Sequence, residues 1–311
     1  MNDEIAVNFF NLYLSSILPL PNFIDTLTLT TDNPAIHGVK GGIRIFQLII
    51  PYRIAKITVK REGTSLIIYS SNVRRFGFVE DIRNSLITSW SIDGILFDTT
   101  PVDHGLTYLQ IAANEWTQES DMLWIGRERH PGTYGPISMI LRNRFIVVIP
   151  SNPVTVDSRF YAQAARELAD SFYIFYRGAV EILRDVDVFD GITARYNLIV
   201  LGGPEDNLYT ARRSRGGGAT LVQFLPNGGY QVAGKKYDFE RELGAVFLAP
   251  SATRTRLCLI VSGVDKEGLL NAARTITFRS EMKTADYMIV KNSGIIAAGY
   301  WNNVWEYSFG Y

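Results

Sequence analysis

Two segments of the chain each run from consecutive apolar residues through a glycine turn into the start of a helix. They are residues 197–207 (NLIVLGGPEDN) and 257–274 (LCLIVSGVDKEGLLNAAR). Buried parallel strands have this near-continuous apolar composition, and strands that alternate with helices are typical of a parallel sheet covered by helices. The two segments therefore limit the C-terminal half of the chain to an α/β architecture.

Further elements in this half follow the same pattern. Residues 144–149 (RFIVVI) form a continuous apolar run. Asp157 or Ser158 can cap the helix expected next, because their side chains accept the free N–H groups of a first turn. Asp265 is expected to cap a second helix in the same way. We therefore predict a Rossmann-like, mostly parallel three-layer α/β domain over residues 141–311.

The N-terminal third has a different pattern. Short β-branched and aromatic runs alternate there with turn residues, and strands are expected at residues 43–50, 54–59, 66–69, 73–78, 94–97 and 107–111. Such spacing is typical of an antiparallel sandwich. We predict a β-sandwich-like domain over residues 1–114, and we interpret the charged, tryptophan-containing residues 115–140 as a connector.

The composition excludes several classes of protein. Lys plus Arg equals Asp plus Glu at 31 each, so no excess positive charge favours nucleic acid or an anionic membrane as partner. Cys258 is the single cysteine, which rules out an intrachain disulfide and a cysteine-based zinc site. We expect no cofactor and no metal.

The sequence contains no signal peptide or membrane-spanning segment that we can identify. No stretch approaches the roughly 18 uninterrupted apolar residues of a spanning helix. Asp3 and Glu4 stand where a signal peptide has basic residues. The compartment stays open, and an extracellular location is possible if the chain is processed from a longer precursor.

Two glycine-rich segments resemble nucleotide-binding loops only in part. Residues 229–236 (GYQVAGKK) end in Lys236, where a phosphate-binding loop has a Ser or Thr, and they lie in an expected hairpin. Gly202 and Gly203 follow a strand without the G-x-G-x-x-G spacing. We interpret both glycines as a structural turn. If an anion or an asparagine-rich interface does bind there, the backbone amides near Glu205 to Asn207 are the candidate donors.

Ser262 is the one serine at the position of a hydrolase nucleophile, between a strand and a helix. The G-x-S-x-G elbow is absent, because Ile260 stands where the first glycine belongs. The three histidines, His37, His104 and His130, lie far apart in the sequence. A base from another part of the chain stays formally possible, but the pattern favours a structural serine.

Two further candidates lie outside the strand ends. His130 belongs to a charged segment that is expected to be a solvated loop or an interface. Trp301 and Trp305 lie close together near the C-terminus. They either pack against the sheet, which we favour, or present a flat platform to a sugar or peptide.

Several segments together carry a resemblance to one family. They are Asn33-Pro34 and residues 41–48, 71–76 (SNVRRF), 92–94 (IDG), 134–137 (YGPI), 197–204 (NLIVLGGP), 263–274 and 298–301 (AGYW). In order and spacing they resemble the region that follows the catalytic domain in large prolyl-oligopeptidase-like α/β-hydrolase proteins, serine peptidases of fungi and bacteria. The resemblance covers most of the chain.

The resemblance implies a β-rich segment and a Rossmann-like layer attached behind a serine hydrolase domain. This chain lacks the family's G-x-S-x-G motif and has no histidine at a matching position, so no active-site residue is carried over. We therefore expect a non-catalytic accessory or scaffold module that shapes substrate access or pairs with a catalytic hydrolase domain or subunit. The alternatives are a carbohydrate- or peptide-binding module and a hydrolase with an unrecognised site at the sheet edge.

Overall fold

The computed structural model describes residues 7, 26–79, 87–97, 106–120, 122–215, 221–276 and 285–310, with the side chain of residue 215 left out. The chain divides into two compact units, and both are discontinuous in sequence. Unit 1 consists of residues 1–31, 38–45 and 54–120. Unit 2 consists of residues 32–37, 46–53 and 121–311.

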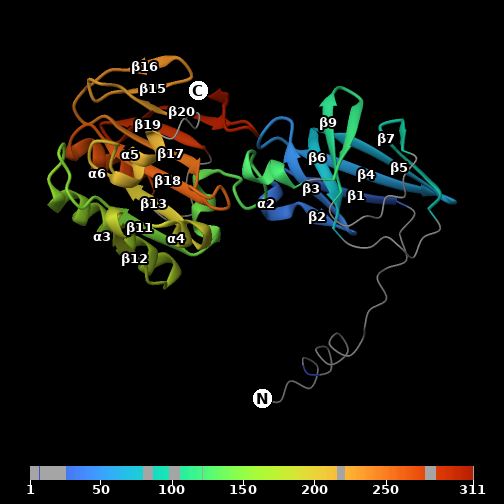
Figure 1. Ribbon diagram of the computed structural model, residues 1–311, viewed down its shortest axis with the longest axis horizontal. Coiled ribbons are helices and arrows are strands. Elements are labelled where there is room, and N and C mark those ends of the chain that lie inside the picture. The colour runs from blue at the N-terminus through green and yellow to red at the C-terminus, as the bar shows by residue number, and fades with distance from the viewer. Residues whose placement is uncertain are drawn as a thin grey trace. The chain divides into compact units, whose positions relative to one another are not determined.

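Unit 1 is built from two five-stranded sheets (Figure 1). The first has the order β1-β4-β5-β7-β8, from β1 (Thr26–Thr31), β4 (Ala55–Glu62), β5 (Ser65–Ser71), β7 (Ser89–Ile92) and β8 (Ile95–Phe97). The second has the order β10-β9-β6-β3-β2, from β10 (Glu115–Glu119), β9 (Thr107–Ala112), β6 (Val73–Phe78), β3 (Ile43–Leu48) and β2 (Val39–Lys40). The last residues of β3, from Phe46 on, count with unit 2.

Aromatic side chains pack together within the core of unit 1. Trp90 from the first sheet packs edge-on against Phe78 and Tyr108 from the second, with ring centroids 6.1 and 4.7 Å apart. Edge-to-face pairs of this kind add to the stabilisation from burial alone. The strands expected near residues 43–50, 54–59, 66–69, 73–78 and 107–111 are confirmed. Glu115–Glu119, at the start of the expected connector, form β10 and pair with β9.

Unit 2 contains one eight-stranded sheet with the order β12-β11-β13-β18-β17-β19-β20-β21 (Figure 1). Its strands are β11 (Phe145–Ile149), β12 (Glu181–Arg184), β13 (Asn197–Leu201), β17 (Gly244–Pro250), β18 (Leu257–Gly263), β19 (Tyr287–Lys291), β20 (Gly294–Trp301) and β21 (Tyr307–Gly310). The pairs among β12, β11, β13 and β18 are parallel. The pairs from β18 through β17, β19, β20 and β21 are antiparallel.

The predicted mostly parallel, three-layer Rossmann-like domain is therefore wrong. Antiparallel pairing predominates across the sheets of the protein, and only one half of the large sheet is parallel. The reason is that a strand buried on both faces has the same apolar composition whichever direction it runs. A two-residue turn, Asn292-Ser293, joins β19 to β20, and both residues have positive φ (49° and 60°), as a tight hairpin between antiparallel strands requires.

One face of the large sheet is covered by two helices, α3 (Ser158–Tyr176) and α6 (Lys266–Thr275), which contact each other. Asp157 caps α3 by accepting from Arg159 N, and Asp265 caps α6 by accepting from Gly268 N at 2.8 Å. Both predicted caps are confirmed. Among the described residues, no helix is both long and apolar enough to cross a membrane.

The opposite face carries α4 (Asp190–Arg195), α5 (Leu208–Arg215) and a separate three-stranded sheet of β14 (Gln223–Phe224), β15 (Tyr230–Val232) and β16 (Lys235–Tyr237). The residues that resembled a phosphate-binding loop belong to this small antiparallel sheet, as the hairpin interpretation predicted.

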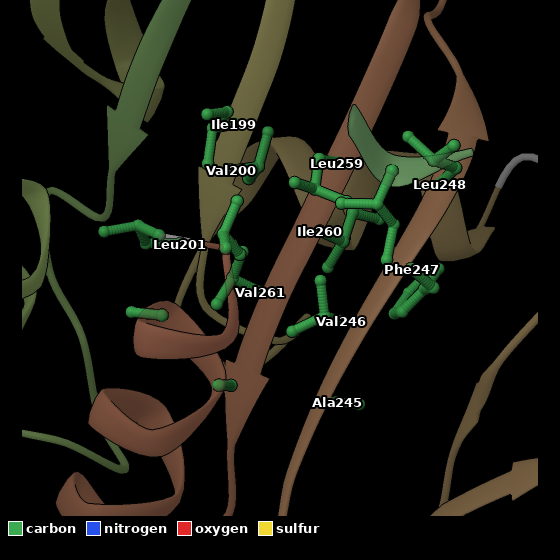
Figure 2. Close-up of a cluster of buried hydrophobic side chains, with 14 of the residues drawn as sticks. Ile199, Val200, Leu201, Ala245, Val246, Phe247, Leu248, Leu259, Ile260 and Val261 are labelled. Carbon is green, nitrogen blue, oxygen red and sulfur yellow. The ribbon is translucent and has the colours of Figure 1, made fainter. Parts of the chain in front are cut away.

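The core of unit 2 lies where β13, β18 and β17 meet. Figure 2 shows apolar side chains from these three strands packed together, with Val246 and Val261 side by side. Both residues are fully buried. This central packing fixes the strand ends at which the candidate site residues lie.

Candidate functional site

The four parallel strands β11, β12, β13 and β18 end at one edge of the large sheet. Open α/β folds place ligands and catalytic groups at this edge. Ser151, Asp185, Gly202 and Ser262 lie at or just beyond the ends of these strands. A substrate could bind at this edge only if some of these polar side chains are exposed and not already hydrogen-bonded within the protein.

Asp206 is the most heavily bonded acid at this edge. Its carboxylate accepts hydrogen bonds from the backbone N–H groups of Val154 (2.6 Å) and Thr155 (2.7 Å), from the Thr155 hydroxyl, and from Tyr161 Oη at 2.7 Å. Burial, reinforced by Asp206, raises the pKa of Tyr161 well above its usual value. Tyr161 therefore stays a neutral donor. Asp206 holds the loop at Val154 and Thr155 in place, and we call this role a loop clamp. The sequence analysis missed this residue.

Asp185 and Asn207 both serve the start of helix α5. Asp185 accepts from Ser151 N, from Ser151 Oγ and, at 2.7 Å, from Leu208 N. Asn207 Oδ1 accepts from Tyr209 N at 2.9 Å, while Asn207 Nδ2 donates to Leu201 O. These bonds satisfy backbone groups that a helix start leaves free. Both side chains are fully buried, and the backbone N–H of Asn207 donates to Gly203 O at 2.9 Å, so neither amide of Asn207 is free for a ligand.

Ser262 is also held by the protein itself. Its hydroxyl accepts a hydrogen bond from Tyr230 Oη at 3.2 Å, and the residue is only 3% exposed. Burial raises the pKa of Tyr230 well above its usual value, although the Ser262 contact lowers it. Within the described ranges, no histidine or carboxylate bonds to Ser262, so these residues supply no base to activate its hydroxyl.

Gly202 and Gly203 allow the chain to turn tightly beside this serine. Gly202 has φ +110°, a conformation that disfavours any side chain. A Cβ on Gly203 would lie 3.1 Å from the Phe224 ring and 3.2 Å from Ser262 Oγ. The structural interpretation of both glycines fits this geometry.

His130 lies elsewhere in unit 2 and acts within a loop. Its Nδ1 accepts from Gly132 N at 3.1 Å, and its Nε2 lies 3.2 Å from the carbonyl of Arg254. The neighbouring Arg129, expected to lie in a solvated or interface loop, is completely buried. That expectation for the charged segment is wrong at Arg129.

Arg129 forms the most buried ion pair of the described chain. Its guanidinium contacts both carboxylate oxygens of Asp286, at 2.8 and 3.1 Å, and Tyr52 Oη donates to the same carboxylate at 2.6 Å. The guanidinium lies between the rings of Tyr134 and Trp305, 5.0 and 4.9 Å from their centroids. Burial alone would lower the pKa of Arg129, but Asp286 raises it above its usual value. The cluster is structural.

Trp301 and Trp305 are both buried, as the packing interpretation predicted. Trp301 donates its indole N–H to Leu248 O at 3.1 Å and stacks on Tyr287 with ring centroids 4.8 Å apart. Trp116 and Trp124 from the expected connector are buried as well. None of these four side chains presents a flat platform to solvent.

One pocket of unit 2 has a volume of about 390 Å³, and the sequence analysis did not identify it. Its apolar wall includes Phe247, Ala249 and Ile260, which point to the face of the sheet opposite α6. Trp305 contributes to the same lining. No local motif marks this site, because its residues come from α4, α5, β14, β17, β18 and the loops near them.

The charged side chains of the pocket lining are mainly cationic. It includes Arg212 and Arg213 from α5 and Arg254 from the loop after β17, with Asp190 as its one acid. Arg213 donates to Ser251 O at 3.1 Å, and Arg254 donates to Arg127 O at 3.2 Å. Within the described part of the chain, none of the three arginines forms an ion pair.

The described residues contain no cluster of three or more His, Cys, Asp or Glu side chains able to hold a metal ion. Cys258 is fully buried in β18, and burial raises the pKa of its thiol to about 12. Such a thiol is a poor nucleophile at neutral pH. His104 lies outside the described residues.

The comparisons with known proteins show a distant relative of unknown function. No family model matches the chain. An uncharacterized secreted protein of the fungus Arthroderma benhamiae is 28% identical over 333 aligned positions, which cover 99% of this chain and 34% of that protein. The chain thus spans about a third of the length of this relative.

Proposed function

We propose that the chain is a non-catalytic scaffold module of a larger hydrolase-type protein, with a role in substrate access or in pairing with a catalytic domain. The observation that carries the proposal is that the polar side chains at the C-terminal ends of the parallel strands are hydrogen-bonded within the protein. We call this edge of the sheet closed. Asp185, Asp206 and Asn207 bond to the protein's own backbone, and Ser262 bonds to a tyrosine. These polar groups at the strand ends thus already have hydrogen-bond partners within the protein.

The length of the fungal relative supports an accessory role. The matched region makes up 34% of that protein, and the remainder is long enough to hold a separate catalytic domain. The relative's name describes a secreted protein, so an extracellular location is part of the proposal. The resemblance to the region behind prolyl-oligopeptidase-like catalytic domains agrees with both points.

The two alternatives receive less support. A carbohydrate- or peptide-binding platform at the C-terminal tryptophans would need their rings exposed, whereas Trp301 and Trp305 are at most 4% exposed. A hydrolase with an unrecognised site at the sheet edge would need a nucleophile with access to substrate, and Ser262 is buried. A scaffold needs neither feature.

A covalent serine-hydrolase probe tests the proposal. We expect no change in intact mass when the folded chain is incubated with a fluorophosphonate, because Ser262 is buried and no histidine or carboxylate of the described residues bonds to it. The matched control is Ser262→Ala, with a known serine hydrolase as positive control. An adduct on the wild-type chain that is lost in Ser262→Ala would overturn the proposal.

A further inference from the structure

The pocket described above combines an apolar surface with a cationic one. Phe247, Ala249 and Ile260 form an apolar floor, and Ala249 is small enough to leave room above the sheet. Phe224 and Trp305 extend this apolar lining. The volume of about 390 Å³ is within the range of small-molecule sites.

The charge of the lining restricts which ligand fits. Arg212, Arg213 and Arg254 carry positive charge, while Asp190 carries the only negative charge in the lining. Arg213 and Arg254 each donate one described side-chain hydrogen bond to a backbone carbonyl and have further N–H groups. Arg212 is exposed and, within the described ranges, has no partner.

A guanidinium presents two parallel N–H groups that match the two oxygens of a carboxylate. The three arginines outnumber Asp190 in the lining, so the net charge of the pocket favours an anion. The apolar floor favours a ring or a branched alkyl group on the same molecule. An apolar carboxylate meets both requirements.

We propose that this pocket binds a carboxylate attached to an aromatic or branched apolar group, with Arg212, Arg213 and Arg254 facing the carboxylate and Phe247 and Ile260 beneath the apolar part. Two sources share this chemistry: a free small acid and the C-terminal residue of a peptide. The inference does not depend on the absence of catalysis, because the pocket residues differ from those at the strand ends.

Isothermal titration with 3-phenylpropionate and 4-methylpentanoate, against 3-phenylpropanamide as the neutral analogue, tests the proposal. We expect at least one of the acids to bind, and 3-phenylpropionate to bind about tenfold more tightly than its amide, since ionised hydrogen bonds are the stronger ones. Arg212→Gln should weaken acid binding roughly three- to tenfold and leave amide binding unchanged.

Arg166→Gln is the matched control, because Arg166 is an exposed arginine on α3, outside the pocket lining. Ala249→Leu fills the floor without a change in charge and should also weaken binding, with circular dichroism used to confirm that the variant folds. A hexapeptide ending in phenylalanine, with a free or an amidated C-terminus, distinguishes the two sources.

Binding of a small acid or of the peptide supports the proposal if it needs the free carboxylate. Equal binding of 3-phenylpropionate and 3-phenylpropanamide would overturn it, as would an absence of binding by every acid and peptide. An equal loss of affinity in Arg166→Gln and Arg212→Gln would also overturn it, because the effect would then come from net charge rather than from the pocket.

Discussion

Single residues explain why the edge of the large sheet is closed. Asp206 and Asp185 are the kind of buried acids that a catalytic site often uses, yet each is surrounded by donors from the nearby loops. A carboxylate with several short hydrogen bonds stabilises the loop that donates them. The polar residues of this edge thus contribute to stability.

Removal of the charge on Asp206 tests this explanation. Asp206→Asn should lower the free energy of unfolding by about 2–3 kcal/mol, because an amide cannot accept all the donors that the carboxylate accepts. Urea denaturation followed by circular dichroism measures the change. Asp170→Asn, on the exposed side of α3, is the control and should change stability by less than about 0.5 kcal/mol. Equal losses of unfolding free energy in Asp206→Asn and Asp170→Asn would contradict the role of Asp206 as a loop clamp.

The sequence could predict the residues whose partners are close in the chain. Asp157 and Asp265 bond to N–H groups two or three residues away, so a local pattern identifies them. The partners of Asp206 lie about fifty residues away, from Val154 to Tyr161. No spacing rule reveals such a contact before the fold is known.

At the scale of elements, glycines determine how closely α6 approaches the sheet. A Cβ on Gly263 would clash with the backbone of Leu269, and one on Gly268 would clash with the carbonyl of Leu243. A helix can lie this close to a strand only where side chains are missing. The sheet-to-helix joint at residue 263, read from the sequence as a turn, is also a packing contact.

Gly263→Ala is therefore expected to destabilise unit 2. The methyl group must displace the backbone of α6, and overpacking of this kind costs about 1–3 kcal/mol. The midpoint of urea denaturation should fall accordingly. Gly126→Ala is the matched control, because a Cβ there meets nothing within 4 Å. A Gly263→Ala variant as stable as Gly126→Ala would show that α6 does not pack this closely.

The existence of most elements followed from the sequence, but the direction of several strands did not. Apolar runs at β17, β18 and β19 indicate burial on both faces and carry no information about direction. The hairpin turn Asn292-Ser293 shows direction only once its positive φ angles are seen. This is why the predicted parallel sheet was wrong from β17 onward.

At the scale of the whole molecule, the composition of unit 2 was beyond sequence analysis. Residues 32–37 and 46–53 belong to unit 2 although, in the sequence, they lie between segments of unit 1. Within unit 2, Asn33 Nδ2 donates to Gly135 O at 2.8 Å, and Leu48 N donates to Tyr134 Oη at 3.0 Å. These partners are separated by 102 and 86 positions, so no local periodicity could reveal them.

The pocket was missed for the same reason. Arg212 and Arg213 form a basic pair in the sequence, but Arg254, Phe247 and Ile260 join them only through the packing of α5 over the sheet. Predictions from the sequence succeeded where a residue's role is local, and failed where residues distant in the chain share one surface.

Turnover by the purified chain tests the central claim most directly. Initial rates should be measured with p-nitrophenyl butyrate and with chromogenic proline-containing peptides, for the wild type and for Ser262→Ala. The closed sheet edge predicts rates equal to the buffer background for both proteins. Saturable hydrolysis by the wild type that Ser262→Ala abolishes would contradict the claim that the chain is a non-catalytic module.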